Sequence, residues 1–414
     1  MELLAPAGNK EKLEVAYHYG ADAVFIGGAL FNLRHQSKNT TTAELEESAN
    51  LARSLGKKMF LTLNAFLHED DTENLKAYLQ EIKHINLDAY IVSDLGSLAI
   101  VKEVIPDATI HISTQASVTN SYSCKMYESL GASRIILARE CSLDEIKKIR
   151  DNTSLELETF VHGAVCMAYS GRCLLSNTLN DRDANKGDCS QVCRWNFKTY
   201  IEEKTRPGEM MEIESDGNYT SILSAKDLRM AEYIHLLKGA GIDSIKIEGR
   251  MKSVYYVAGV VRVYRKLLDT LEEVGIENFE EAIRKEPIIN YLAELDTISR
   301  RESDTGFYFE NKEDIKSTDK GYLKGRRLMG MIADDVDANS GYSKINVYNT
   351  IKKGDKIVYI GRDFLNYTDE NFELFTKDDE GNFYPVDQIR QIDNAYIKSS
   401  VHNFSKYDIL TVEE

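Results

Sequence analysis

Several residue types that mark special classes of protein are scarce in this sequence. Only 5 of the 414 residues are proline and 1 is tryptophan, while 43% are hydrophobic and 29% are charged. This composition is ordinary for a globular protein and argues against collagen-like or proline-rich disordered chains. No apolar run approaches the roughly 18 residues of a membrane helix, and the first residues do not resemble a signal peptide. We therefore expect a cytoplasmic protein with no membrane partner.

Basic residues are also few relative to acidic ones. The chain carries 51 lysine and arginine residues against 67 aspartate and glutamate residues, a formal net charge of -16. A protein that coats nucleic acid or an anionic membrane usually has the opposite sign. The balance still allows a local basic site.

Short apolar runs alternate with helical patterns through the first part of the chain. Runs rich in valine and isoleucine are typical of parallel strands that are buried on both faces. The candidate strands are Glu2–Leu4, Asp22–Ile26, Lys58–Leu63, Asp88–Val92, Thr109–Ile112, Arg134–Leu137, Leu155–Phe160 and Ser244–Ile247, with Ser221–Leu223 as a ninth or accessory strand. Eight such units predict an α/β fold of the (β/α)8, TIM-like barrel type. An open doubly wound sheet is the alternative, but Ala5-Pro6-Ala7-Gly8 lacks the dinucleotide-binding glycine pattern.

Local signals mark where several helices begin. Thr41 and Ser142 each precede a glutamate by three residues, which is the spacing of a capping box. A long helical pattern follows Ser253 and runs to about Arg284. These signals place helices between the candidate strands, as a barrel requires.

The pattern changes along the chain and predicts three regions. Residues 1–286 form the barrel, with a cysteine-rich insertion at 166–218 after the seventh strand. Residues 287–321 form a linker region, and residues 322–414, which alternate polar and apolar residues between turns, form a small all-β barrel or sandwich domain. An insertion at the C-terminal end of a barrel strand lies where barrel enzymes carry their chemistry.

Four of the six cysteines cluster in the insertion, namely Cys166, Cys173, Cys189 and Cys193. Thiolates are soft ligands, and four of them suit Zn²⁺ or an iron–sulfur cluster. Neither the Cys-x(6)-Cys pair nor the Cys-x(3)-Cys pair matches the Cys-x(2)-Cys knuckle of a zinc ribbon. The wider spacing favours a [4Fe–4S] cluster, with zinc or unligated thiols as alternatives. Cys124 and Cys141 lie in or beside helical patterns and are predicted to be buried core residues.

Basic residues and the single tryptophan surround the cysteine pairs. They are Arg172, Arg182, Lys186, Arg194, Lys198 and Trp195. Cations there can offset the negative charge of a cluster or bind an anionic substrate, and Arg194 with Trp195 can stack on a base. The alternative is a solvated loop of mixed charge.

The segment Glu158–Ser176 resembles the signature of peptidase family U32. It matches the pattern Glu-x-Phe-x-x-Gly-Ala-hydrophobic-Cys-x(4)-Gly-x-Cys-x-hydrophobic-Ser at every specified position. The resemblance extends to Glu2–Gly8, Ser113–Gln115, Asp243–Arg250 and the Cys189–Trp195 segment. It covers nearly the whole chain and is weaker over the C-terminal β region.

The resemblance implies a function, a cofactor and partners. The family branch with a barrel and a C-terminal β domain of this length takes part in oxygen-independent, prephenate-dependent 5-hydroxylation of the wobble uridine of tRNA. Relatives hydroxylate a ribosomal RNA cytidine or a ubiquinone precursor. The resemblance thus implies tRNA and prephenate as partners, a paralogous family member as a further candidate partner, and a [4Fe–4S] cluster on Cys166, Cys173, Cys189 and Cys193.

The peptidase in the family name is an alternative with little sequence support. His68-Glu69-Asp70-Asp71 does not match the H-E-x-x-H zinc motif, and the chain contains no G-x-S-x-G elbow. His162 lies four residues before Cys166, so a Cys–His nucleophilic pair stays open. A zinc-stabilised scaffold or RNA-binding adaptor is a third hypothesis.

Polar residues at or near predicted strand ends complete the candidate site. The candidate anion-binding groups are Arg34, Arg139, Lys246 and Arg250. The candidate acid–base groups are His162, Glu158, Glu248, Lys246 and Asp227. The side-chain amides of Asn64 and Gln115 can orient a substrate. Ordinary salt bridges are the alternative for Arg139 with Glu140 and for Lys246 with Glu248.

Overall fold

The computed structural model describes most of the chain. The described residues are 1–32, 40–166, 173, 175–182, 184–195, 200–202, 208, 210–212, 226–309, 322–334, 341–363, 366–391, 394–399 and 404–414. The candidate strand Ser221–Leu223 and the candidate site residue Arg34 lie outside them.

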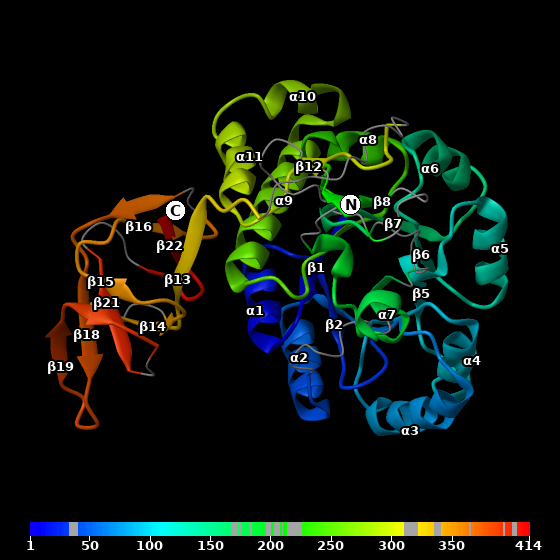
Figure 1. Ribbon diagram of the computed structural model, residues 1–414, viewed down its shortest axis with the longest axis horizontal. Coiled ribbons are helices and arrows are strands. Elements are labelled where there is room, and N and C mark those ends of the chain that lie inside the picture. The colour runs from blue at the N-terminus through cyan, green and yellow to red at the C-terminus, as the bar shows by residue number, and fades with distance from the viewer. Residues whose placement is uncertain are drawn as a thin grey trace.

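Eight parallel strands close into the predicted barrel (Figure 1). They are β1 (Glu2–Ala7), β2 (Ala23–Gly27), β3 (Lys58–Leu63), β4 (Ala89–Val92), β5 (Ile110–Ile112), β6 (Arg134–Ile136), β7 (Glu156–Ala164) and β11 (Ser244–Ile247). Each strand pairs with the next, and β11 pairs in parallel with both β7 and β1, which closes the ring. The predicted fold class is confirmed.

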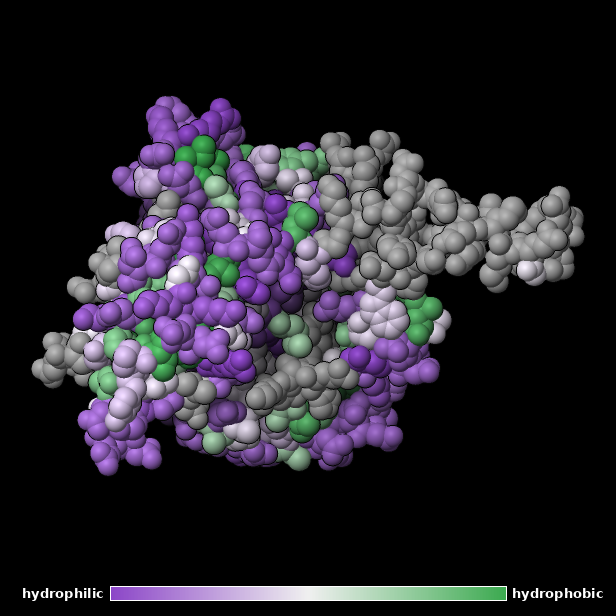
Figure 2. Space-filling view, turned by 60° about the vertical axis from the view of Figure 1, so that its left-hand side comes forward, coloured by the Kyte–Doolittle hydropathy of each residue, from purple (hydrophilic) through white to green (hydrophobic). Residues whose placement is uncertain are grey.

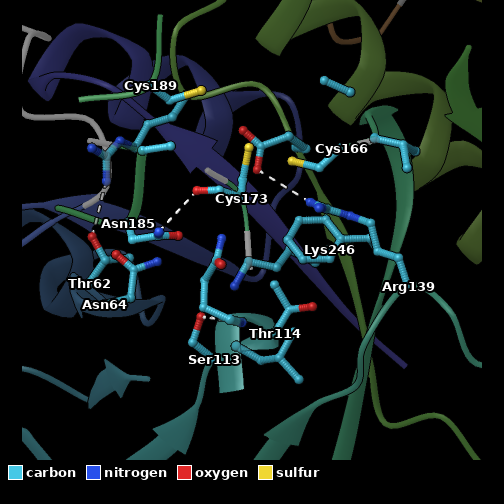
Figure 3. Close-up of a pocket in the computed structure, with 18 of the residues that line it drawn as sticks. Thr62, Asn64, Ser113, Thr114, Arg139, Cys166, Cys173, Asn185, Cys189 and Lys246 are labelled. Atoms are coloured by element: carbon cyan, nitrogen blue, oxygen red, sulfur yellow. Dashed lines mark hydrogen bonds and ion pairs between the residues drawn. The ribbon is translucent and has the colours of Figure 1, made fainter. Parts of the chain in front are cut away.

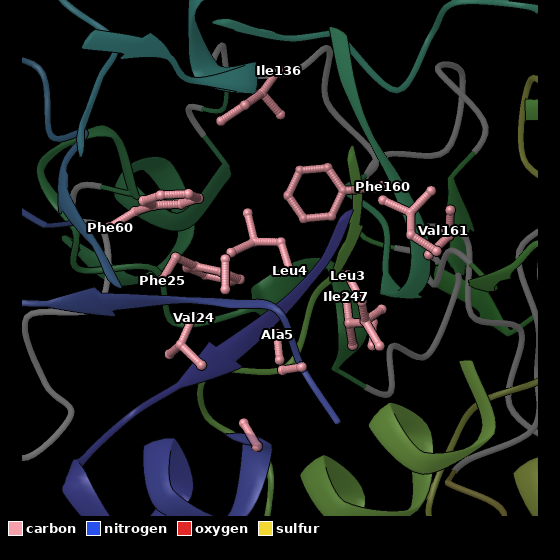
Figure 4. Packing of buried hydrophobic residues seen from close by; sticks show 14 of the residues in the cluster. Leu3, Leu4, Ala5, Val24, Phe25, Phe60, Ile136, Phe160, Val161 and Ile247 are labelled. Carbon is pink, nitrogen blue, oxygen red and sulfur yellow. The ribbon is translucent and has the colours of Figure 1, made fainter. Parts of the chain in front are cut away.

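Apolar side chains on both faces of the strands explain the closure. Figure 4 shows Leu4, Phe25, Phe60 and Phe160 in the barrel interior, whereas Val24 points toward the surrounding helices. These residues are buried and belong to one core cluster. Because consecutive residues of a strand point to opposite faces, two-sided burial requires the nearly continuous apolar runs seen in the sequence.

Helices cover the outside of the barrel. They are α1 (Lys10–His18), α2 (Thr42–Ser54), α3 (Thr72–Ile82), α4 (Leu95–Val104), α5 (Ser121–Ser129), α6 (Leu143–Arg150), α8 (Ile234–Gly239), α9 (Val254–Val274), α10 (Phe279–Ala282) and α11 (Ile288–Thr297). Both predicted capping boxes are present, at Thr41 and at Ser142. The helix predicted to reach Arg284 instead ends at Val274, because Gly275 has a φ of 78° that breaks the helical backbone.

The cysteine-rich insertion leaves the barrel after β7 and returns at β10 (Asp227–Arg229). β10 runs antiparallel to the end of β7, with Asp227 opposite Ala164, and pairs with β12 (Ser303–Asp304). The described parts of the insertion include α7 (Leu175–Asn180) and the hairpin of β8 (Tyr200–Glu202) and β9 (Met210–Glu212).

The C-terminal part of the chain forms an eight-stranded antiparallel sheet with its own apolar core. Its strands are β13 (Arg326–Ile332), β14 (Ser343–Val347), β16 (Ile357–Ile360), β17 (Tyr367–Asp369), β18 (Glu373–Lys377), β19 (Phe383–Val386), β21 (Ala395–Lys398) and β22 (Ile409–Glu413). Two short strands, β15 (Ile351–Lys352) and β20 (Gln388–Ile389), form a separate pair. The segment predicted as a linker contains α11, which packs against α9 of the barrel.

Buried polar contacts join the sheet to the barrel. The Tyr19 hydroxyl donates to the backbone oxygen of Ile360, at 2.8 Å, and Arg262 Nη1 donates to that of Gly361, at 3.0 Å. The described residues on the face seen in Figure 2 are mainly hydrophilic, with hydrophobic side chains in small separate groups. None of the helices in the described part of the chain has the length and apolar character to cross a membrane.

Candidate active site

A pocket of about 1230 Å³, including its open mouth, lies at the C-terminal ends of the barrel strands. Its lining combines residues that follow β3, β5, β6 and β11 with residues of the cysteine-rich insertion (Figure 3). Six of the predicted substrate and acid–base residues line it, namely Asn64, Gln115, Arg139, Lys246, Glu248 and Arg250. This is the end of the barrel at which TIM-barrel enzymes carry their active sites.

All four clustered cysteines line this one pocket. Cys166 is exposed and the other three are partly exposed, whereas Cys124 and Cys141 are buried as predicted. Burial raises the pKa of the Cys124 thiol to about 11, which keeps that thiol protonated and inert. The cluster cysteines thus differ from the core cysteines in both place and exposure.

The donor set suits a soft metal centre. In the described part of the chain, no three His, Cys, Asp or Glu side chains converge as a metal site. Four accessible thiols that share one pocket are nevertheless the ligand chemistry that an iron–sulfur cluster uses. Cys166, Cys173, Cys189 and Cys193 would hold such a group.

Backbone hydrogen bonds fix part of the insertion over the barrel. The Asn185 side chain donates to the backbone oxygen of Cys173, at 3.0 Å, and the Phe66 amide donates to the backbone oxygen of Asn185, at 3.1 Å. Asn185 therefore connects a cysteine of the insertion to the loop that follows β3. This link brings the thiols to the mouth of the barrel, where the polar strand ends lie.

Arg139 and Glu248 face each other across the pocket wall. Arg139 Nη2 lies 3.8 Å from Glu248 Oε2, whereas the alternative drawn from the sequence pairs Arg139 with Glu140. The Arg139 guanidinium lies over the Phe160 ring, 4.0 Å from its centroid. An arginine stacked on one ring can accept a second planar group on its opposite face. The pair therefore offers a platform for a flat, polar ring.

The alternation of Lys246 and Glu248 on one strand suggests a salt bridge between them, but the ion pair that Lys246 forms is with Glu158. Lys246 Nζ lies 3.0 Å from Glu158 Oε1 inside the barrel, and Arg134 Nη1 lies 2.9 Å from the other oxygen of Glu158. Glu158 is fully buried and does not belong to the pocket lining. This glutamate acts as a counter-ion on the barrel floor rather than as a group in contact with the pocket.

Arg250 is buried and held in a fixed orientation. Its Nη1 donates to Thr62 Oγ1, at 3.1 Å, and its Nη2 donates to Asn32 Oδ1. Gly27 makes room for it, since a Cβ at this position would lie 2.6 Å from Arg250 Nη1. Three basic side chains (Arg139, Lys246 and Arg250) and one acidic side chain (Glu248) line the pocket of this acidic chain.

Besides Glu158, three predicted catalytic or binding residues lie apart from the described pocket lining. His162 packs against Tyr256 and Tyr264 of α9, because an irregularity in the β7–β11 register turns it away from the interior. Asp227 Oδ2 accepts the backbone N–H of Arg301, at 3.1 Å. Trp195 is 43% exposed. The Arg194 side chain lies outside the described residues.

Sequence reasoning missed several lining residues. They are Phe25, Thr62, Ser113, Thr114, Phe160, Asn185 and Gln191. Thr62 and Phe160 alternate with buried residues on predicted strands, so strand ends and strand parity could have identified them. Asn185 and Gln191 belong to the insertion and carry no comparable signal.

Comparison with known proteins identifies the class. The family model "Peptidase family U32" matches residues 8–318, which includes the barrel strands from β2 to β11 and the four clustered cysteines. The chain therefore belongs to peptidase family U32.

Three relatives illustrate the range of names within this family. The chain is 38% identical to "tRNA hydroxylation protein P1" of Bacillus subtilis over 89% of this chain and 85% of that relative. It is 37% identical to "23S rRNA 5-hydroxycytidine C2501 synthase" of Escherichia coli over 66% of this chain and 40% of that relative. It is 31% identical to "Collagenase" of Porphyromonas gingivalis over 68% of this chain and 70% of that relative.

Proposed function

We propose that this protein is a tRNA-modifying enzyme that hydroxylates C5 of the wobble uridine, with prephenate as co-substrate and a [4Fe–4S] cluster as cofactor. The observation that carries the proposal is that four cysteines share one pocket with cations, amides and a carboxylate. The relative named for tRNA supports tRNA over ribosomal RNA. Its alignment covers 89% of this chain and so must extend beyond Tyr322 into the C-terminal sheet, whereas this chain covers 40% of the ribosomal relative.

Cys166, Cys173, Cys189 and Cys193 would hold the cluster, because they are the accessible thiols that line the pocket. When bound, an iron–sulfur cluster supplies redox chemistry or a Lewis acid next to the substrate. The cations that line the same pocket would offset its negative charge.

The barrel residues would position the base. The Arg139 guanidinium, 4.0 Å from the centroid of the Phe160 ring, would stack on the flat pyrimidine. The amides of Asn64 and Gln115 carry both donors and acceptors, so they would hydrogen-bond the polar edge of uracil. Extrusion of a single base would let an acidic protein use tRNA without coating its backbone.

Proton transfer and anion binding fall to other side chains of the pocket. Glu248 is the one acidic residue in the described lining and would accept the proton from C5, with Arg139 holding the carboxylate in place. Arg250 would bind a carboxylate of prephenate, since arginine forks match carboxylate geometry, and Lys246 lines the same pocket. His162 and Glu158 would act only through packing and charge balance.

Nucleoside mass spectrometry of tRNA tests the proposal. A strain that lacks the gene and every redundant paralogue should lose 5-hydroxyuridine-derived nucleosides, and the wild-type gene should restore them. Cys166→Ala should fail to restore them and should yield a colourless protein after anaerobic purification. Cys124→Ala is the matched control, because Cys124 is buried away from the pocket and should leave colour and product in place.

Unchanged 5-hydroxyuridine in the deletion strain would contradict the proposal. Loss of 5-hydroxycytidine from 23S rRNA in the same strain would identify the ribosomal alternative instead. Reconstitution with purified protein, tRNA and prephenate would show whether a paralogous partner is required.

A peptidase is the second candidate function, favoured by the relative named "Collagenase". A cysteine nucleophile needs a histidine within hydrogen-bonding reach. His162 packs against α9 and does not line the pocket that Cys166 lines. Cleavage of gelatin by cluster-free protein, abolished in Cys166→Ala, would support the peptidase.

A further inference from the structure

Lys246 differs in chemistry from the other cations of the pocket. Among the described lining residues, Lys246 is the one lysine, and so the one with a primary amine in its side chain. The side chain is 4% exposed, and its Nζ lies 4.4 Å from the centroid of the Phe25 ring and 5.5 Å from that of Phe160. Burial leaves this amine poorly solvated, which favours its neutral and nucleophilic form, while the two ring faces attract the ammonium form.

The counter-ion of Lys246 is shared with a second cation. Glu158 presents one oxygen to Lys246, at 3.0 Å, and the other to Arg134, at 2.9 Å. Because Arg134 competes for the negative charge, Glu158 stabilises the ammonium form less than an exclusive partner would. Burial is the largest cause of a lowered pKa for Lys246, and Glu158 offsets that effect only in part.

A carboxylate-binding group lies beside this amine on the barrel wall. Lys246 Nζ lies over Phe25, and Arg250 Nη1 lies against Gly27. Phe25 and Gly27 are two residues apart on β2 and face the same side, so their Cα atoms are about 7 Å apart. In an α-keto acid the carboxylate is bonded directly to the carbonyl carbon. The carbonyl carbon can therefore meet the amine while the carboxylate meets the guanidinium.

We propose that Lys246 Nζ forms a reversible imine with the carbonyl carbon of an α-keto acid, whose carboxylate is bound by Arg250. The inference deepens the proposed function and rests on it, because prephenate carries an α-keto carboxylate. It assigns Lys246 as a catalytic residue that captures the co-substrate covalently.

The step balances without an oxidant or a reductant. The neutral amine of Lys246 attacks the carbonyl carbon, so a carbon–nitrogen bond forms. The carbonyl oxygen takes up two protons and leaves as water. The protonated imine then carries the positive charge that the ammonium group carried, and Glu158 stays in place as its counter-ion.

Reductive trapping with pyruvate as the probe tests this inference. Purified protein is incubated with pyruvate and sodium cyanoborohydride, which reduces an imine to a stable amine. We expect one adduct per chain, located by peptide mapping on Lys246. Acetone, which has the carbonyl but lacks the carboxylate, should label at least about tenfold more slowly, equivalent to about 1.4 kcal/mol of recognition.

Two variants sharpen the result. Lys246→Arg keeps the charge but cannot form the imine, so it should lose the adduct. Lys252→Arg is the matched control, because Lys252 lies near Tyr256 and Tyr322 and is not part of the pocket lining. Labelling spread over exposed lysines, or an adduct in wild-type protein that excludes Lys246, would overturn the inference even if Lys246→Arg failed to fold.

The trapping experiment is independent of RNA. An adduct on Lys246 in a protein that does not hydroxylate tRNA would contradict the proposed function but support the imine. Hydroxylated tRNA from a protein that forms no adduct would do the reverse.

Discussion

Gly27 shows how one residue can determine the geometry of the pocket. It lies at the end of β2, where the Arg250 guanidinium passes close to the backbone. A Cβ at this position would lie 2.6 Å from Arg250 Nη1 and 2.9 Å from Asn32 Cγ. Because Asn32 and Thr62 hold the two ends of the guanidinium, the arginine has no room to move aside.

Gly27→Ala should therefore disturb Arg250 while leaving the rest of the barrel intact. Overpacking at a buried position costs about 1–3 kcal/mol, which denaturant unfolding would measure. The variant should also lose most pyruvate trapping at Lys246. Gly239→Ala is the control, since no atom lies within 4 Å of its Cβ position on a helix, and alanine there should be neutral or slightly stabilising. Equal stability of the two variants would contradict the steric argument.

On strand β7, the simple alternation of side chains predicts the wrong face for one residue. Glu158, Phe160 and His162 are two residues apart, so simple alternation places all three inside the barrel. The register with β11 shifts after Phe160, and Ile247 then pairs with His162. His162 consequently faces α9, where its Nδ1 lies 3.4 Å from the Tyr264 hydroxyl.

This burial has a consequence for the pH dependence of stability. Burial lowers the pKa of His162 to about 3, whereas an unfolded histidine titrates near 6.5. Between these values the unfolded chain binds a proton that the folded chain does not, so the free energy of unfolding falls on acidification. Acidification from pH 7 to pH 5 should cost about 2 kcal/mol through this residue.

His162→Gln should lose less stability than the wild type over that pH interval, by about 2 kcal/mol. Urea unfolding at pH 7 and pH 5 would measure the difference. His84→Gln is the control, because the His84 side chain is 55% exposed and its removal should leave the pH dependence of the wild type. A His162→Gln variant that follows the wild-type profile would argue against a buried neutral histidine.

The elements themselves could be predicted well from the sequence. Lys58–Leu63 and Ser244–Ile247 have the predicted bounds, because short stretches rich in apolar residues between helical patterns are typical of buried parallel strands. The side chains of Asn64, Gln115 and Arg250 could be placed at the barrel mouth, because the C-terminal ends of parallel strands meet there. His162 could not be placed, because a bulge is decided by pairing between distant strands. The place of Asn185 also depends on tertiary contacts, here with the loop after β3.

At the scale of the whole molecule, a buried carboxylate couples the C-terminal sheet to the barrel. Glu294 of α11 is 2% exposed and accepts hydrogen bonds from Arg326 Nη1, at 3.0 Å, and from Asn366 Nδ2, at 2.9 Å. Arg262 Nη2 of α9 lies 3.8 Å from the same group. One carboxylate thus serves two guanidiniums from different parts of the chain.

Glu294→Gln should weaken this junction more than any surface change. Removing the charge from a buried ion pair costs about 3–5 kcal/mol, because the guanidiniums stay buried without a counter-ion. Chemical denaturation should show that loss, with a separate transition for the C-terminal sheet. Glu281→Gln, at an exposed i,i+4 pair with Lys285, should leave stability nearly unchanged. Similar losses in the two variants would show that the junction does not depend on Glu294.

The pairing of Asp227 with Ala164 has a consequence for how this protein can vary in length. The two ends of the cysteine-rich insertion are neighbours on adjacent antiparallel strands, so the barrel itself closes the loop between them. Lengthening such a loop adds little closure entropy, about 0.6 kcal/mol for each doubling, and leaves the strand register unchanged. Insertions and deletions between the cysteine pairs can therefore accumulate without disturbing the barrel. The barrel strands keep their register while the length of this segment changes.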